Sequence, residues 1–209
     1  MKKISIIDYG LCNIFNVVEA FKHIGCDVIV TDESDKIKNA DYLVLPGVGA
    51  FQNGMNGLNE KRLIEPIISH VEQSKPFLGI CLGMQMMMSS SSEFGEALGL
   101  NLISGKVNKI PNKMENRKHK IPHIGWNNLI MNDIDIKKIF ATTRRTYPVY
   151  FVHSYMASCD NPADCIAYTD YNGLKIPAIV RKYNAIGCQF HPEKSGHVGL
   201  DLLKNFIRI

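Results

Sequence analysis

The chain has no long apolar run, and its charges nearly balance. It carries 24 Lys and Arg against 20 Asp and Glu, which gives a formal net charge of +4. A membrane-spanning helix needs about 20 consecutive apolar residues, so the sequence predicts none. A charge of +4 is also too small to indicate a nucleic-acid surface. We therefore expect neither a membrane nor a nucleic acid as a partner.

The cysteines lack the spacing of a metal site or a disulfide framework. None stands in a CxxC pair, so neither a zinc site nor a disulfide framework is indicated. We expect no metal and no cofactor. Free thiols, together with the lack of a signal peptide, fit a reducing cytoplasm, where we expect the protein to reside. The six cysteines are Cys12, Cys26, Cys81, Cys159, Cys165 and Cys188.

Length and patterning predict a single α/β domain over residues 1–209. The composition is 45% hydrophobic and 21% charged, which is ordinary for a globular chain. Strand-length apolar segments alternate with amphipathic helices, and this alternation predicts a mostly parallel central sheet with helices on both faces. We expect strands at 3–8, 27–31, 42–45 and 77–80, one helix that starts at 14 after a cap at Asn13, and another over 62–73.

The C-terminal part predicts a small antiparallel portion. Residues 165–171 and 177–181 have strand composition and are joined by Asn172-Gly173, a strong hairpin signal. We expect further strands at 149–154 and 186–190, then a closing helix at 198–207 capped by Ser195.

A cysteine stands at the sharpest predicted turn. Cys81 follows strand 77–80 and precedes a run of helix formers, with Gly79 and Gly83 on either side. Such an elbow projects its side chain from the end of the strand, beside the free N–H groups that open the helix. Those groups favour a thiolate, so the sequence indicates a nucleophile. A small buried cysteine in a βα turn has about equal weight on this segment alone.

Two other strand ends carry turns that suit catalysis. Pro46-Gly47-Val48-Gly49 ends strand 42–45, and its backbone N–H groups can serve as an oxyanion hole, although a plain turn also explains it. His191 and Glu193 follow the last strand, where the carboxylate can orient the imidazole; a surface turn is the alternative. Strand ends of a doubly wound sheet face one crevice, so we expect the three segments to meet there.

Four segments carry weaker signals. The basic stretch 106–120 predicts a solvated loop, with docking of an acidic partner as the alternative. We interpret Ser89 to Ser92 as a solvated stretch that ends the elbow helix. The segment 121–127, which holds Trp126, fits a loop that packs or docks, and His153 fits a hydrogen-bonded strand residue.

Together, an elbow cysteine, a base, a carboxylate and an oxyanion turn are the parts of acyl transfer through a thioester. The segments GICLGMQ (79–85), PGVGAF (46–51) and QFHPEKS (189–195) resemble those of class I, triad-type glutamine amidotransferases, which have a flavodoxin-like fold. The segments IDYGLCN (7–13), IPHIGWN (121–127) and YFVHSY (150–155) are similar, more narrowly, to the glutaminase subunits of imidazole glycerol phosphate synthases.

The resemblance implies a role for each matching residue. Cys81 would be the nucleophile, His191 the general base and acid, and Glu193 the residue that orients His191. The oxyanion hole would fall on Leu82, Val48 and Gly49, and glutamine would bind at Gln85, Gly47, His153 and Ser154. The partner interface would include Asn13, His123, Trp126, Tyr150 and Lys194.

The resemblance further implies hydrolysis of L-glutamine to glutamate and ammonia. The ammonia would pass to a (β/α)8 synthase subunit in a heterodimer that makes imidazole glycerol phosphate and an aminoimidazole carboxamide ribotide for histidine biosynthesis. We expect low activity without the partner, and a peptide flip at Val48 that completes the oxyanion hole.

Three alternatives stay open at this point. The chain could serve a different synthase as a paralogous subunit, since the basic segment and the serines depart from the family pattern. It could also be a stand-alone cysteine hydrolase on the same scaffold, or a binding module without catalysis.

Overall fold

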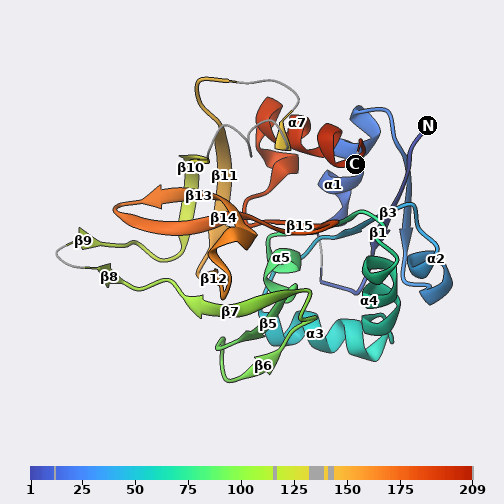
Figure 1. The fold of residues 1–209 in the computed structure, drawn as a ribbon, viewed down its shortest axis with the longest axis horizontal. Coiled ribbons are helices and arrows are strands. Elements are labelled where there is room, and N and C mark those ends of the chain that lie inside the picture. The colour runs from blue at the N-terminus through green and yellow to red at the C-terminus, as the bar shows by residue number, and fades with distance from the viewer. Residues whose placement is uncertain (12, 115–116, 132–138, 141–143, 209) are drawn as a thin grey trace.

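The structure is a computed structural model that describes residues 1–208 apart from 12, 115–116, 132–138 and 141–143 (Figure 1). Cys12 and part of the basic stretch 106–120 therefore lie outside the described residues. In the part of the chain that is described, no helix is long and apolar enough to cross a membrane.

A seven-stranded sheet runs through the centre in the order β13-β14-β15-β4-β3-β1-β2. The five strands from β15 to β2 are parallel to one another, and β13 and β14 at the other edge are antiparallel. This confirms the predicted sheet and its antiparallel C-terminal portion. The parallel strands are β1 (Lys3–Ile7), β2 (Asp27–Thr31), β3 (Tyr42–Leu45), β4 (Phe77–Ile80) and β15 (Ala185–Cys188); the antiparallel ones are β13 (Cys165–Tyr171) and β14 (Leu174–Lys182).

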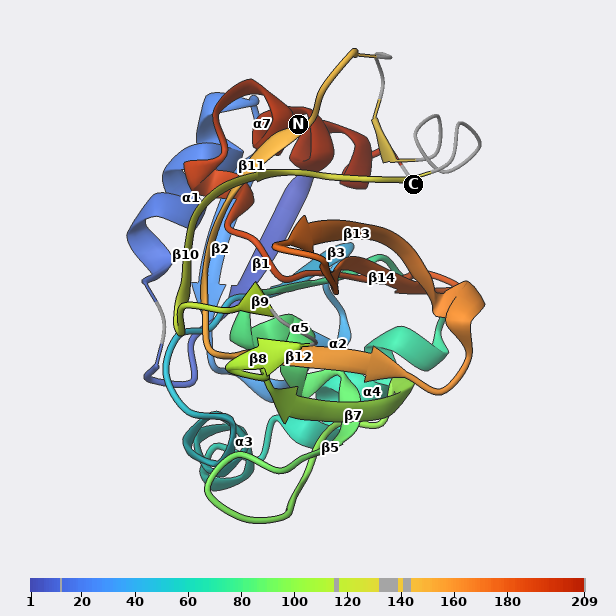
Figure 2. The ribbon, with the colours of Figure 1, turned by 90° about the vertical axis from the view of Figure 1, so that its left-hand side faces the viewer.

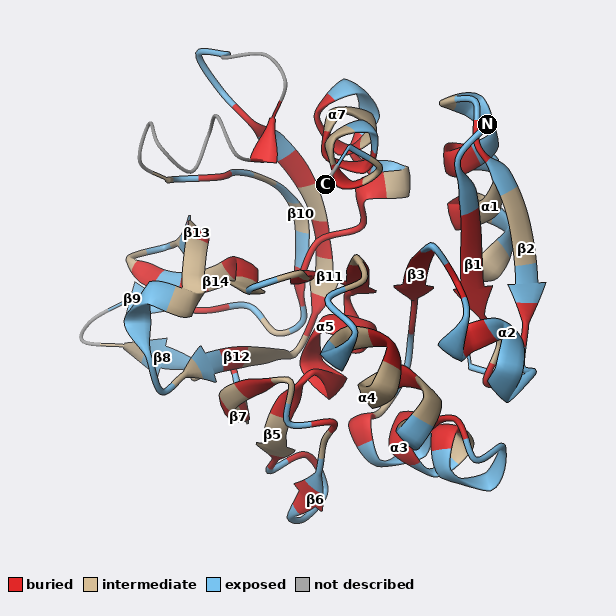
Figure 3. Ribbon diagram, turned by 45° about the vertical axis from the view of Figure 1, so that its right-hand side comes forward, coloured by how far each residue is buried: buried red, intermediate tan, exposed pale blue. Residues whose placement is uncertain are grey.

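Helices cover both faces of this sheet, as predicted (Figure 2). Alternate residues of a strand point to opposite faces: Val44 packs with α1 and α7, whereas its neighbours Leu43 and Leu45 pack with α3, α4 and α5. The central strands are buried, and the edge strand β2 is largely accessible (Figure 3). The helices are α1 (Ile14–His23), α2 (Ser34–Lys38), α3 (Phe51–Glu60), α4 (Ile64–Glu72), α5 (Leu82–Met86) and α7 (Gly196–Phe206).

A second, four-stranded sheet has the order β12-β7-β5-β6, and the sequence did not predict it. Ser89 to Ser92 were expected to be a solvated helix end, and this was wrong for most of the segment. Ser91 is fully buried, because the backbone of β5 pairs with strands on both sides whatever the polarity of its side chains. The strands are β5 (Met88–Ser91), β6 (Ala97–Leu98), β7 (Ile103–Lys109) and β12 (Tyr155–Cys159).

Two predicted loops also form strands. The segment with Trp126 is β10 (His123–Asn128), which pairs antiparallel with β11 (Pro148–His153). In the basic stretch, β7 extends to Lys109, and a short hairpin follows from β8 (Lys113–Met114) and β9 (Arg117–Lys118). Here backbone pairing outweighs a composition that is poor in β-branched residues.

The two predicted cap residues, Asn13 and Ser195, stand at the N-cap positions of their helices, but neither side chain makes a capping hydrogen bond. Asn13 precedes α1 without a side-chain cap bond. Ser195 precedes α7, but its hydroxyl donates to the His191 carbonyl (2.6 Å) and accepts from the Tyr150 N–H (3.0 Å). Ser195 thus links β11 to the turn η2 (Pro192–Lys194) instead of capping the helix.

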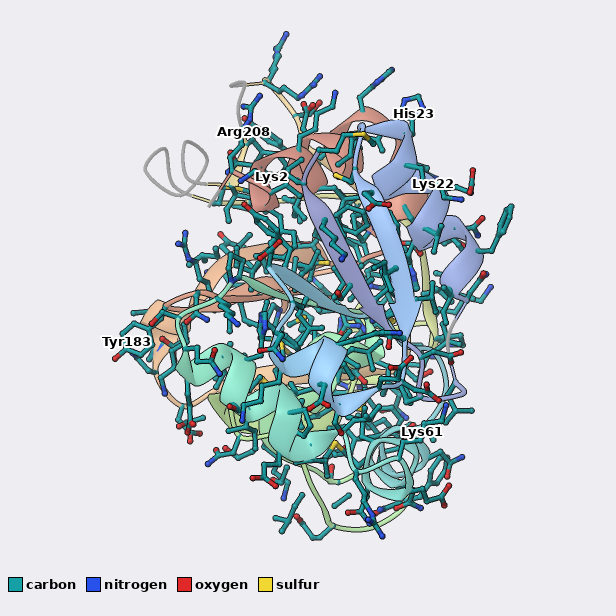
Figure 4. The ribbon with its side chains drawn as sticks, turned by 90° about the vertical axis from the view of Figure 1, so that its right-hand side faces the viewer. Lys2, Lys22, His23, Lys61, Tyr183 and Arg208 are labelled. Carbon is teal, nitrogen blue, oxygen red and sulfur yellow. The ribbon has the colours of Figure 1, made fainter. Side chains whose placement is uncertain are left out.

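Charged and polar side chains such as Lys22 and Tyr183 point outward from the sheet (Figure 4).

Candidate active site

The predicted elbow is present. Cys81 lies between β4 and α5 with φ 54° and ψ −107°, a backbone conformation that costs a non-glycine residue free energy. Its N–H donates to the Cys188 carbonyl (2.8 Å), which ties the corner to β15. A Cβ on Gly83 would lie 1.8 Å from the Leu45 carbonyl oxygen, so only glycine lets α5 approach β3 this closely. The glycine at position 83 therefore allows the sharp strand-to-helix turn that carries the Cys81 thiol.

His191 and Glu193 form a buried pair at the end of β15. The imidazole Nδ1 donates to Glu193 Oε1 over 2.7 Å, and the two side chains are 5% and 3% exposed. The other ring nitrogen, Nε2, is buried and has no aligned hydrogen-bond partner among the described residues. Cys81 and His191 line the same cavity of about 290 Å³. The structure thus brings together the three residues predicted as a triad, with Glu193 behind the imidazole.

Electrostatics favour a proton on this imidazole. Burial opposes a charge on His191, but the Cys81 side chain and the Glu193 carboxylate beside it raise the pKa of His191 to about 10. A positive imidazole is stabilised by a negative sulfur on one side and a carboxylate on the other. His191 therefore holds a proton at neutral pH, beside the sulfur of Cys81.

Most of the predicted site residues line the cavity. Gly47 and Glu193 lie outside its lining, although both touch residues within it. The predicted residues in the lining are Val48, Gly49, Cys81, Leu82, Gln85, His153, Ser154 and His191.

The predicted oxyanion hole is not open. The Leu82 N–H donates to the Gly47 carbonyl (3.4 Å), and the Val48 N–H donates to the Leu11 carbonyl (3.2 Å). Two of the three backbone groups expected to stabilise an oxyanion are therefore already engaged. Both bonds involve the peptide group between Gly47 and Val48: its carbonyl oxygen accepts from Leu82, and its N–H donates to Leu11.

One carboxylate of the cavity was missed by the sequence analysis. Glu93 is 8% exposed, lines the cavity, and accepts a hydrogen bond from the Phe51 N–H at the start of α3 (2.8 Å). Its only sequence signal is an acid at the end of a run of serines. Tyr155, at the start of β12, lines the same wall and was also missed.

His153, which lines the cavity, packs against the buried ring of His123. His153 Nδ1 donates to the Tyr155 carbonyl (2.8 Å), and its Nε2 pairs with His123 Nδ1 (2.9 Å). Burial, opposed by the bond to Tyr155, lowers the pKa of His153 to about 3. His153 is the hydrogen-bonded strand residue that the sequence predicted. His123 was expected at a partner interface, but it is only 1% exposed and offers no contact surface.

The other predicted interface residues are accessible or partly so. Trp126 is 56% exposed and packs edge-on against Tyr150, with the two ring centroids 5.9 Å apart. Asn13 and Lys194 are exposed, at the start of α1 and in η2. The Tyr150 carbonyl accepts a hydrogen bond from the His191 N–H (3.0 Å), so this surface is joined to the triad by backbone.

Within the described residues, no group of three or more His, Cys, Asp or Glu side chains is placed to hold a metal ion.

Comparisons with known proteins show the family of the chain. Residues 5–209 match the family model described as "Glutamine amidotransferase class-I". The chain therefore belongs to the class-I glutamine amidotransferase family.

Relatives within the family narrow the resemblance. The chain is 47% identical to the imidazole glycerol phosphate synthase subunit HisH 1 of Legionella pneumophila (strain Paris), over 100% of both chains. It is also 47% identical to the subunit HisH of Lactococcus lactis subsp. lactis (strain IL1403), over 99% of this chain and 98% of the relative. The narrower resemblance to HisH glutaminase subunits is thus confirmed.

A solved structure supports the fold. The structure of PurLQS from Thermotoga maritima superposes with a TM-score of 0.74 at 18% identity, covering 99% of this chain and 98% of the other. At that identity the likeness concerns the fold alone, and it confirms the predicted fold class.

The raised pKa of His191 can be tested directly. We expect the ring of His191 to titrate near pH 10 in NMR spectra of the intact protein. The variants Glu193→Gln and Cys81→Ala should each lower the midpoint, because each removes a group that raises this pKa. Glu65→Gln, which changes an exposed carboxylate on α4, is the matched control and should leave it unchanged. A wild-type midpoint close to the ordinary value of about 6.5 would contradict the ion pair.

Proposed function

We propose that the chain is the glutaminase subunit of an imidazole glycerol phosphate synthase and hydrolyses L-glutamine through a thioester on Cys81. The observation that carries this proposal is that Cys81 and His191 line the same cavity, while Glu193 is hydrogen-bonded to His191. At about 290 Å³ the cavity suits a ligand of amino-acid size. The names of the full-length relatives support the choice of synthase.

In the proposed reaction, the Cys81 thiolate attacks the side-chain amide carbon of glutamine. His191, which holds a proton at neutral pH, gives it to the departing ammonia and becomes neutral. The neutral imidazole then takes a proton from water, which cleaves the γ-glutamyl thioester to glutamate and regenerates the thiolate. Glu193 keeps the imidazole oriented through both steps.

The oxyanion of the tetrahedral intermediate needs backbone donors that are engaged in this structure. Rotation of the Gly47–Val48 peptide would break both the Leu82–Gly47 and the Val48–Leu11 hydrogen bonds in one movement. It would release the Leu82 N–H and turn the Val48 N–H towards the sulfur, while Gly47 accepts the change of backbone angle freely. We therefore propose that the closed turn is the resting state, and that the open one is active.

The two buried carboxylates near the sulfur have different proposed roles. Glu193 acts on the imidazole, whereas Glu93 faces the cavity and can bind the α-ammonium group of glutamine. Gln85, His153 and Ser154 line the remaining wall and would hold the rest of the substrate.

Ammonia in neutral water becomes ammonium and ceases to be a nucleophile, so it has to pass directly to an acceptor. We propose a heterodimer with a (β/α)8 synthase subunit that makes imidazole glycerol phosphate and an aminoimidazole carboxamide ribotide. The accessible residues Asn13, Trp126, Tyr150 and Lys194 would form the docking surface. In this proposal the chain acts as one glutaminase domain over residues 1–209, in the cytoplasm, without a cofactor.

The direct test is co-purification with the synthase subunit, followed by glutamine-dependent turnover of its phosphoribulosyl substrate. We expect little glutamine hydrolysis by the chain alone, strong stimulation by the loaded partner, and a loss of about a thousandfold or more in Cys81→Ala. Equal rates of glutamine hydrolysis with and without the partner would contradict the proposal that the closed turn is an inactive resting state. Hydrolysis of peptides in preference to glutamine would point to a stand-alone cysteine hydrolase.

The role of Glu93 predicts a separate effect. In Glu93→Gln we expect the KM for glutamine to rise about tenfold or more, because a charged hydrogen bond to the substrate is lost, with a smaller change in kcat. Glu96→Gln is the matched control, since Glu96 is an exposed acid of the same hairpin that pairs with Lys106. Equal effects of the two substitutions would contradict the assignment.

A further inference from the structure

Beside the triad, a second side chain reaches the sulfur of Cys81. Gln189 directly follows β15 and is fully buried. Its side-chain Nε2 donates to Cys81 Sγ over 3.8 Å, and its Oε1 accepts from Gln85 Nε2 over 3.0 Å. The Gln189 backbone N–H donates to the Ala178 carbonyl (2.9 Å), which holds the residue against β14.

The orientation of this amide follows from its partners. Gln85 Nε2 also contacts the Tyr155 carbonyl over 3.0 Å, and a carbonyl can only accept. The amino group of Gln85 must therefore face Tyr155, and the group next to it on Gln189 must be the oxygen. If the Gln189 amide were rotated, two amino groups would face each other. The Tyr155 carbonyl thus determines the orientation of both side-chain amides. In that orientation the amino group of Gln189 faces the sulfur of Cys81.

We propose that Gln189 is a further catalytic residue, whose amide N–H stabilises the thiolate of Cys81; this inference rests on the function proposed above. A hydrogen bond to an anion is stronger than one to a neutral acceptor, and burial strengthens it further. The bond therefore favours the thiolate over the thiol before attack. It also favours release of the sulfur as a thiolate when the thioester is hydrolysed.

This assignment separates two roles around one atom. His191 supplies a positive charge and a proton that it gives away during the reaction. Gln189 supplies a donor that never changes its protonation, so the sulfur keeps one hydrogen bond while the imidazole is neutral. Gln85 lines the cavity and holds Gln189 in place, which links the wall of the binding site to the nucleophile.

A purely structural role is the competing explanation, because Gln189 also joins the end of β15 to α5. The two roles differ in what they change. A structural link alters thermal stability, whereas a donor to the sulfur alters the pH at which the sulfur becomes reactive.

The test is the rate of alkylation of Cys81 by iodoacetamide as a function of pH, in the full chain, with peptide mass spectrometry to separate Cys81 from the other cysteines. Gln189→Met removes the donor at similar size, and Gln189→Glu replaces it with a carboxylate. We expect the pH midpoint of alkylation to rise by about one unit in Gln189→Met, which is about a tenfold slower reaction at pH 7, and further in Gln189→Glu. The plateau rate at high pH should stay unchanged.

Thr169→Val is the matched control, because it deletes the hydrogen bond of another fully buried residue, from the Thr169 hydroxyl to the Asn128 carbonyl (2.9 Å), without touching the sulfur. It should lower the melting temperature and leave the midpoint in place. Should the Gln189 variants fail to fold, the side-chain ¹⁵N–¹H signals of Gln189 in the wild type should shift with the midpoint of alkylation.

Unchanged midpoints in both Gln189 variants, or amide signals of Gln189 that ignore the ionisation of the sulfur, would overturn the proposal. The outcome is separable from that of the glutaminase test. Shifted midpoints in a protein that does not hydrolyse glutamine with its partner would refute the proposed function and leave the action of Gln189 on the sulfur intact.

Discussion

The backbone of Cys81 is held at a positive φ (54°) that an L-residue avoids, and the site depends on that constraint. The surrounding structure enforces it from two sides. β15 accepts the Cys81 N–H through the Cys188 carbonyl, and Gly83 allows α5 to approach β3 until no Cβ would fit. The strain is offset by the packing of a buried parallel sheet, and it aims the sulfur into the cavity.

The same register places the partners of the sulfur. β15 pairs with β4, so the residues that follow β15 emerge beside the elbow. Gln189 comes first and turns its amide to the sulfur, and His191 and Glu193 follow two and four residues later. A single strand end therefore supplies a neutral donor, an imidazolium and the carboxylate that orients it. This arrangement explains why widely separated segments of sequence form one reactive centre.

Much of this could be predicted from the sequence, because the parallel strands are continuous apolar runs and the glycines around Cys81 permit the sharp turn and the close packing of an elbow. The residues at strand ends could be placed for the same reason. The second sheet could not, since β5 is formed by serines and is held by backbone pairing with strands that are distant in sequence. The β10 strand, with its glycine and asparagines, carries equally little strand signal.

Side-chain contacts were the other limit. Glu93 and Gln189 make their contacts with residues that only the tertiary structure brings close, so neither was predicted as a site residue. The burial of His123 was likewise hidden, because its sequence position fits a surface as well as an interior. The hydrogen bonds of the Gly47–Val48 peptide were also not predicted, because the Leu11 carbonyl and the Leu82 N–H that engage it are brought close only by the tertiary structure.

The most direct test of the central claim is to treat the protein with a glutamine analogue that alkylates thiols, in the presence of its partner, and to identify the modified residue by mass spectrometry. The account predicts a single adduct on Cys81, formed at neutral pH and suppressed by excess glutamine. An unmodified Cys81, or an adduct that forms at the same rate when glutamine is present, would contradict it.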